Sequence, residues 1–241
     1  MRSTATRVRA GVERRAQILR HRGDAVLCPI CDHRFDRFKD DWNRANALCW
    51  RCGSHERHRA QWLVLTGPRG LLHCARSLLH FAPEWALRRE LRRVPSLRYV
   101  TADVSGEGVD LRLDLTALDL QDAAFDAVLC SHVLEHIEDD RAAMRELARV
   151  TGPGGWCLVM VPLDSSRSET YEDPAITSPE ERLRAFWQHD HVRLYAADIG
   201  DRLAGAGFEV ERIRPEAELG SDVLRRCRIN PSDDVWLCRR G

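Results

Sequence analysis

The feature that most constrains the fold of this 241-residue chain is a pair of Cys-x-x-Cys motifs near its start. Cys28 and Cys31 form the first motif, Cys49 and Cys52 form the second, and 17 residues separate them. Two such motifs at this spacing predict a four-thiolate zinc ribbon or finger. Zinc would supply folding free energy that so small a unit lacks by itself. Because all four ligands are thiolates, we expect a closed, structural site; the alternative is a set of buried thiols.

The composition is that of a globular protein with reduced thiols. Hydrophobic residues make up 44% of the chain, which excludes an intrinsically disordered chain. No apolar run approaches the roughly 18 residues of a membrane span, so no membrane association is expected. The nine cysteines are an odd number, and residues 1–22 lack the apolar stretch of a signal peptide. We therefore expect a cytoplasmic location.

Charge is distributed unevenly along the chain. Residues 1–98 carry 21 basic and 9 acidic side chains, whereas residues 99–241 carry 16 basic and 28 acidic ones. The opposite charges predict that the two parts dock on each other, which weakens the case for a nucleic-acid partner without excluding it. An anionic substrate held by arginines of the zinc unit is the second interpretation.

Three segments are expected in chain order. Residues 1–24 form a basic N-terminal helix, and residues 25–66 form the four-Cys unit with a following helix that Ser54 caps. From about residue 67 to residue 241, short apolar strands alternate with helical patterns, which predicts an α/β domain with a mostly parallel sheet. Strands are expected at residues 78–81, 98–102, 111–113, 127–130, 156–161, 208–214 and 235–238. Helices are expected at residues 84–93, 133–150, 179–187 and 196–204.

Ligands of an open α/β sheet bind at the carboxyl ends of its strands, near the point where the strand order reverses. The first strand is followed by residues 80–84, which read HFAPE. Asp103 follows the second strand, 21 residues after Ala82, the spacing at which an acid reaches the hydroxyls of a ribose. Asp114 follows the third strand.

Two further segments resemble a known family. Residues 125–136 read FDAVLCSHVLEH and residues 149–155 read RVTGPGG. They are similar to the fourth strand and the PGG turn of the class I S-adenosylmethionine-dependent methyltransferases, in particular the bacterial small-molecule type. The resemblance covers roughly residues 70–241 and implies a doubly wound, Rossmann-like sheet of seven strands. The four-Cys segment recurs in a subset of that family. These motifs are specific for the fold, but not for a substrate.

The resemblance implies how S-adenosylmethionine binds. Asp103 holds the ribose, Asp114 and Leu115 meet the adenine, and the backbone at Cys130 and Ser131 faces the methionine part. The residues expected at the cofactor are His80, Phe81, Ala82, Pro83, Glu84, Asp103, Asp114, Leu115, Cys130 and Ser131.

The first loop departs from the family. His80 stands in place of an acid, and Ala82, Glu84 and Ala86 stand in place of three glycines. Glycines there let the backbone turn tightly and approach the ligand. The alternative interpretation is therefore a degenerate pocket that no longer binds the cofactor.

Histidines are the candidate catalytic bases, because their pKa lies near neutrality. His132 and His136 are four residues apart, which places them on one face of the expected helix, and His132 is the better candidate. The alternative is that His132 caps the helix or packs under the loop.

A second histidine pair, His189 and His191, flanks Asp190 in residues 163–195, a segment that commonly forms the substrate lid in such folds. Either histidine could be the base instead. These two with His132 and His136 could also build a second metal site, although no carboxylate spacing supports it.

Three functions remain. The first is methyl transfer to oxygen or nitrogen of a small molecule or modified peptide, as in secondary metabolism. The second is RNA methylation, with the zinc unit and the basic N-terminal part gripping phosphates; the third is a non-catalytic, zinc-stabilised binding protein. The sequence after the fourth strand, Ser131-His-Val-Leu, lacks the Asn/Asp-Pro-Pro-aromatic pattern of enzymes that methylate base amino groups, which favours the first. The methylated atom and the oligomeric state stay open.

Overall fold

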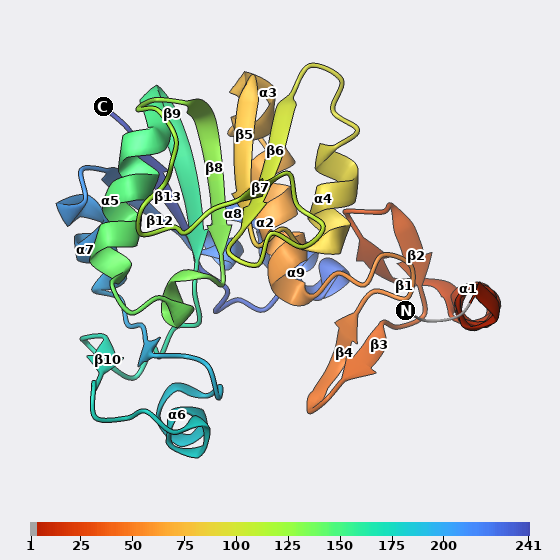
Figure 1. The fold of residues 1–241 in the computed structure, drawn as a ribbon. Helices are drawn as coiled ribbons and strands as arrows, with labels where there is room; N and C mark the ends of the chain where they lie inside the picture. Colours follow the sequence, from red (N-terminus) through yellow and green to blue (C-terminus); the bar gives the residue numbers. More distant parts are fainter. Residues whose placement is uncertain (1–3) are drawn as a thin grey trace. The chain divides into compact units, whose positions relative to one another are not determined.

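The computed structural model describes residues 4–241. Its centre is a seven-stranded sheet with the strand order β12-β13-β9-β8-β5-β6-β7. The strands are β5 (Ser77–Phe81), β6 (Arg98–Asp103), β7 (Leu111–Arg112), β8 (Phe125–Ser131), β9 (Thr151–Met160), β12 (Glu209–Ile213) and β13 (Val235–Arg239). The first five run parallel, and β13 pairs antiparallel with both β9 and β12. The expected doubly wound, mostly parallel sheet is confirmed (Figure 1).

The central strands β5, β8 and β9 are buried because their sequences are largely apolar, as expected for parallel strands covered on both faces. β8 and β9 bury Val128, Cys130, Cys157 and Val159 in the same core cluster. Helices α5 (Asp140–Val150) and α7 (Ile199–Gly205) pack apolar faces onto this cluster. Helix α5 begins where the side chain of Asp139 accepts a hydrogen bond from the backbone N–H of Ala142, at 2.8 Å.

Residues 163–195 form a separate excursion after β9. It contains β10 (Tyr171–Glu172), α6 (Pro179–Phe186) and β11 (Arg193–Leu194), and β10 pairs antiparallel with β11. Ser178 and Glu181 form the capping box expected from the sequence at the start of α6. Figure 1 shows β10 and α6 beyond the lower end of the sheet.

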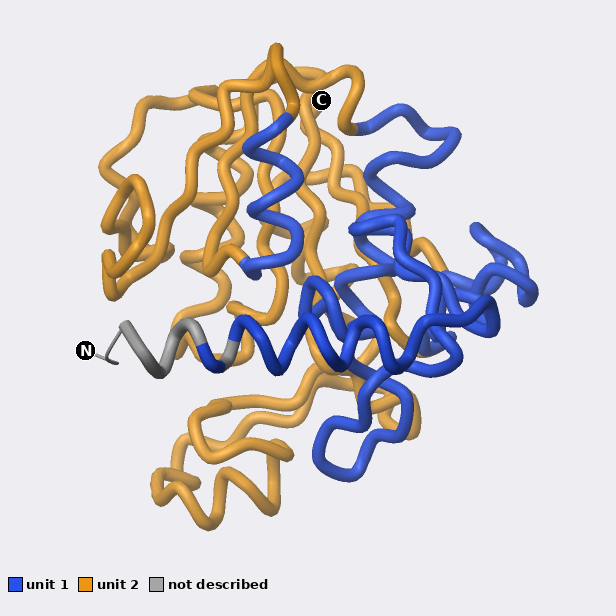
Figure 2. Tube along the Cα trace, turned by 90° about the vertical axis from the view of Figure 1, so that its right-hand side faces the viewer, with its two compact units in different colours: residues 1–71, 84–93, 215–231 blue, residues 72–83, 94–214, 232–241 orange. Residues whose placement is uncertain are grey.

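The chain divides into two compact units that do not follow its linear order (Figure 2). Unit 2 holds residues 72–83, 94–214 and 232–241, and therefore the sheet. Unit 1 holds residues 1–71, 84–93 and 215–231. The elements outside the sheet and the excursion, mostly in unit 1, are α1 (Thr4–Arg20), β1 (Arg22–Cys28), β2 (His33–Phe35), β3 (Lys39–Asp41), β4 (Arg44–Leu48), α2 (Glu56–Thr66), α3 (Leu71–Cys74), α4 (Trp85–Leu91), α8 (Pro215–Leu219) and α9 (Ser221–Cys227).

Arg59 of α2 holds unit 1 together. Its side chain is 0% exposed and lies over the ring of Phe38, 4.4 Å from the centroid. It donates hydrogen bonds to the carbonyl oxygens of Ala47 and Ser54, and to those of Cys227 and Arg228 at the end of α9. One guanidinium therefore joins the hairpins to the C-terminal helices through four carbonyl groups.

Two local expectations were wrong. The residue that caps α2 is His55, not Ser54. The expected helix over residues 133–150 is interrupted: a 3₁₀ turn, η1 (Leu134–His136), precedes α5, and His132 has a left-handed backbone with φ 56°. His132 and His136 therefore do not share a helix face. The first three residues of the expected N-terminal helix lie outside the described residues, and within residues 4–241 no helix is long and apolar enough to span a membrane.

Candidate functional site

A cavity of about 800 Å³ lies at the carboxyl ends of the parallel strands, all within unit 2. Ala82 follows β5, Asp103 ends β6, Asp114 follows β7, and His132 and His136 follow β8. Strand order reverses between β5 and β8, so the cavity is at the position where this kind of sheet binds ligands. Its volume is in the range of small-molecule sites.

The loop after β5 makes a glycine-like turn without a glycine. Ala82 has φ 45°, in the left-handed region, and its N–H donates to the carbonyl oxygen of Ala102 at 2.9 Å. Phe81 and Ala82 both line the cavity. The backbone thus adopts the turn that a cofactor loop needs, with an alanine bearing the strain that a glycine would avoid.

Both acids expected at the cofactor reach the cavity with ordered side chains. One oxygen of Asp103 accepts hydrogen bonds from the N–H and hydroxyl of Ser105, at 2.8 and 2.7 Å. Asp114 accepts equivalent bonds from the N–H and hydroxyl of Thr116 at 2.9 and 2.7 Å, and these bonds lower the pKa of its carboxyl group. Leu115 lines the cavity beside it. A carboxylate on each of two neighbouring strands can accept hydrogen bonds from ribose and adenine groups.

The remaining side chains expected at the cofactor, those of His80, Pro83, Glu84, Cys130 and Ser131, are not among those that line this cavity. His80 is fully buried, and its Nδ1 lies 2.9 Å from the hydroxyl of Tyr99. Cys130 is in the apolar core. Glu84 belongs to unit 1, where its carboxylate lies 3.6 Å from Nε2 of His58.

The candidate histidines near β8 and in the excursion differ in whether they line the cavity. His132 and His136 line the cavity, whereas His189 is exposed and outside its lining. Nδ1 of His132 lies 3.2 Å from Oε1 of Glu135, a side chain that is 1% exposed. The sequence interpretation missed Glu135; the signal was its place within the VLEH motif, between the two cavity histidines.

His136 and His191 come together although 55 residues separate them. Their rings meet edge to face with centroids 4.7 Å apart. Nδ1 of His136 lies 3.4 Å from Oδ2 of Asp190. Burial lowers the pKa of His191, which keeps its imidazole neutral near pH 7.

Arg193 fixes this part of the site. Its buried guanidinium donates to the carbonyl oxygens of Leu134, Ile137 and Glu138, which surround η1. Glu172 accepts from the same side chain at 2.8 Å and from Arg202 at 3.0 Å. These bonds join the excursion to the turn after β8. They therefore fix the segment with His189 and His191 relative to the segment with His132 and His136.

In unit 1 the four sulfurs of Cys28, Cys31, Cys49 and Cys52 lie within 4.8 Å of one another. The Sγ atoms of Cys28 and Cys52 are 3.5 Å apart, and those of Cys31 and Cys49 are 3.7 Å apart. Zinc–sulfur bonds of 2.3 Å in a tetrahedron require about 3.8 Å between sulfurs, so the four residues fit a zinc ion. The hydroxyl of Ser54 lies 3.2 Å from Sγ of Cys52 and 3.3 Å from that of Cys28.

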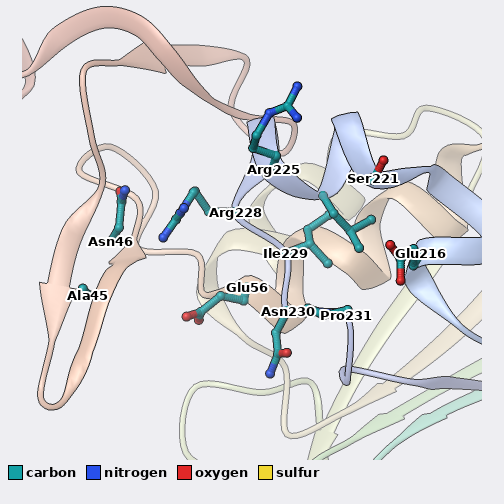
Figure 3. A pocket seen from close by; sticks show the side chains of 11 residues that line it. Ala45, Asn46, Glu56, Glu216, Ser221, Arg225, Arg228, Ile229, Asn230 and Pro231 are labelled. Atoms are coloured by element: carbon teal, nitrogen blue, oxygen red, sulfur yellow. The ribbon is translucent and has the colours of Figure 1, made fainter.

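Unit 1 also has a cavity of about 470 Å³ at the C-terminal helices. Figure 3 shows the side chains of Arg225 and Arg228 and the carboxylates of Glu56 and Glu216 around it. None of its lining residues belongs to the loops that follow β5, β6, β7 or β8, so it is not where the fold places a nucleotide-like cofactor.

Comparison with known proteins agrees with this geometry. Residues 87–159 match the family described as "Methyltransferase domain". A demethylmenaquinone methyltransferase of Mycolicibacterium paratuberculosis is 32% identical over 114 residues, which are 42% of this chain and 50% of the relative. A probable S-adenosylmethionine-dependent methyltransferase of Mycolicibacterium smegmatis is 36% identical over 127 residues, 50% of this chain and 45% of the relative. The alignments thus span about half the length of these curated relatives.

Solved structures share the fold. A SAM-dependent methyltransferase from Archaeoglobus fulgidus has a TM-score of 0.51 and 13% identity, over 79% of this chain and 96% of that one. A Burkholderia thailandensis 1,6-didemethyltoxoflavin-N1-methyltransferase has a TM-score of 0.50 and 12% identity, over 77% and 79%. The sheet order and the solved structures show the fold of the class I S-adenosylmethionine-dependent methyltransferases, and residues 87–159 match the methyltransferase domain family.

Proposed function

We propose that this protein transfers a methyl group from S-adenosylmethionine to oxygen or nitrogen of a small molecule. The observation that carries the proposal is the cavity at the strand-order reversal, with Asp103 and Asp114 on neighbouring strands and His132 opposite the loop of Ala82. The matched relatives named demethylmenaquinone methyltransferases act on a small molecule, which supports a small-molecule acceptor over a macromolecule.

The cavity residues divide between cofactor and acceptor. Asp103 holds the ribose hydroxyls, and Asp114 with Leu115 holds the adenine. When bound, S-adenosylmethionine supplies the electrophilic methyl group. His132 accepts the proton of the acceptor, because its ring lines the cavity and its Nδ1 lies 3.2 Å from the carboxylate of Glu135. Residues 163–195 form the lid over the acceptor, which excludes water from the reacting atoms.

The four cysteines hold a structural zinc ion. Their closed, all-thiolate arrangement leaves no open position for a substrate, so the ion stabilises unit 1 and takes no part in methyl transfer. The thiolates need a reducing compartment, and we place the protein in the cytoplasm for that reason.

Cofactor binding tests the proposal directly. S-adenosylmethionine or its demethylated product should raise the melting temperature of the purified protein, because ligand that binds only the folded state stabilises it by about 2.7 kcal/mol at 100 times Kd. Asp103→Ala should abolish the rise, since it removes the ribose acceptor. Asp119→Ala changes an exposed acid outside the cavity and should keep it.

A wild-type protein that shows no rise with either ligand would favour the non-catalytic binding protein. If the melting temperature of Asp103→Ala still rises with ligand, the cofactor binds without Asp103, in another part of the molecule.

A further inference from the structure

Glu135, His136 and His191 form a cluster that methyl transfer alone does not explain. Each offers one ligand atom, and these three atoms lie within 4.8 Å of one another. Glu135 is 1% exposed and His191 is 4% exposed, while His136 also lines the cavity. Two imidazole nitrogens and a carboxylate oxygen are a ligand set typical of divalent transition metals.

The two histidines have their outer nitrogens engaged. Nδ1 of His191 donates to the carbonyl oxygen of Phe186 at 2.9 Å, because a carbonyl can only accept. Nδ1 of His136 faces the carboxylate of Asp190 at 3.4 Å. Both contacts favour the tautomer whose lone pair is on Nε2. Histidines that bind metals have this arrangement, with the second nitrogen donating to a carbonyl or carboxylate.

The carboxylate of Glu135 is short of hydrogen-bond donors. Neither of its oxygens accepts a hydrogen bond from any group in residues 4–241, although both are buried. Its ion-pair contact is with Nδ1 of His132, at 3.2 Å from Oε1. A carboxylate buried without donors is costly, and a metal ion bound to its oxygens would offset that cost.

Hydrogen bonds within the protein hold the backbone around the cluster. The N–H of Val192 donates to the carbonyl oxygen of Glu135 at 2.8 Å, directly beside His191. Arg193 donates to the carbonyl oxygens of Leu134 and Glu138 on either side of Glu135 and His136. These hydrogen bonds hold the backbone of the three ligands in place, so a metal ion would draw the side chains together without refolding the chain.

We propose that Glu135, His136 and His191 bind a divalent first-row transition-metal ion, of the Zn²⁺ or Fe²⁺ class, at the edge of the cavity. Three protein ligands leave positions open, and one of the ligands, His136, lines the cavity. There the ion binds an oxygen of the acceptor and lowers the pKa of its hydroxyl group. This catalytic role rests on the proposed methyl transfer, whereas the metal site itself does not.

Metal binding alone tests the site. Wild-type protein is dialysed against a chelator mild enough to leave the four-thiolate zinc in place, then titrated with Co²⁺. One further equivalent should bind, with the weak visible absorption of nitrogen and oxygen ligands and without the intense charge-transfer bands of thiolates. Uptake that shows only thiolate bands, or no uptake, overturns the proposal.

Variants assign the ligands. Glu135→Gln and His191→Ala should each weaken Co²⁺ binding by more than about 100-fold, beyond the 10- to 100-fold effects of residues that merely support a ligand. His189→Ala, which changes an exposed histidine two positions away, should bind Co²⁺ like wild type.

Unchanged Co²⁺ binding in both Glu135→Gln and His191→Ala overturns the site. If a variant fails to fold, the wild-type spectrum still decides. Co²⁺ binding without any response to S-adenosylmethionine would support the metal site and reject the methyltransferase.

Discussion

Two residues at the cavity have left-handed backbones: Ala82 with φ 45° and His132 with φ 56°. For an alanine this conformation costs about 1–2 kcal/mol, whereas histidine tolerates it better. Strain of this kind persists where the surrounding structure imposes it, commonly at functional sites. Here β5 and β8 impose it, because the N–H groups of Ala82 and His132 are bound to carbonyl oxygens of β6 and β9. The glycine-poor loop of the sequence is therefore a strained loop with the backbone of a glycine-containing one.

Ala82→Gly should stabilise the protein by about 0.5–1 kcal/mol, because relief of the left-handed strain exceeds the added entropy of an unfolded glycine. The shift in the urea unfolding midpoint measures it. Ala86→Gly is the matched control: this residue is in helix α4, where glycine should destabilise by about 1 kcal/mol. A loss of stability in Ala82→Gly would show that Ala82 is not strained.

Some residues of the site could be predicted from the local sequence around them, and others could not. Asp103 and Asp114 were found because each follows a strand at a set spacing, which is local information. The roles of Glu135 and Arg193 were not predicted, since Arg193 contacts carbonyl groups more than 50 residues earlier in the chain. Arg59 is a similar case, because two of its carbonyl partners come from the C-terminal helices.

The secondary-structure elements followed the sequence pattern where burial is uniform and departed from it where the chain turns. The expected central strands formed where apolar residues are continuous, whereas β12 alternates exposed and less exposed residues. The expected helix over residues 133–150 instead split into η1 and α5, since His132 leaves the helical region and Asp139 caps a new start. Both His132 and His136 line the cavity although they do not share a helix face.

Elements far apart in sequence should lose structure together when zinc is removed. Helix α9 contacts β1, and Arg226 of α9 pairs with Asp24 of β1 at 2.6 Å. Cys31→Ser should therefore remove the zinc and raise amide hydrogen exchange in residues 215–231 as well as in residues 25–53, because both belong to unit 1.

Elemental analysis and exchange mass spectrometry measure the two effects, and Cys74→Ser, at an exposed cysteine outside the cluster, is the control. Faster exchange confined to residues 25–53 would show that the stability of the C-terminal helices does not depend on the zinc ion.

At the scale of the whole molecule, equal numbers of acidic and basic side chains give a formal charge of zero. The basic excess of residues 1–98 is partly neutralised within unit 1. There Arg69 pairs with Glu218 at 2.6 Å and lowers the pKa of that carboxyl group. Asp24 likewise pairs with both Arg34 and Arg226. The arginines so engaged are less available to phosphates.

RNA binding should accordingly be weak and easily disrupted by salt. A filter-binding assay with total RNA should retain no complex at about 200 mM salt, because phosphate contacts lose affinity steeply as salt rises. Tight binding that survives this salt would restore RNA as the substrate class and reject a small-molecule acceptor.

The sequence by itself determined the mostly parallel sheet, the resemblance to methyltransferases, the two acids that follow its strands and the four cysteines that fit a zinc ion. All of these depend on short spacings and on runs of apolar residues, which are local properties. Only the tertiary structure decided which histidines meet, that Glu135 is buried between them, and that residues 84–93 and 215–231 belong with the four-Cys unit. The physical reason is that such contacts depend on where the chain returns after long connections, and no local pattern specifies that return.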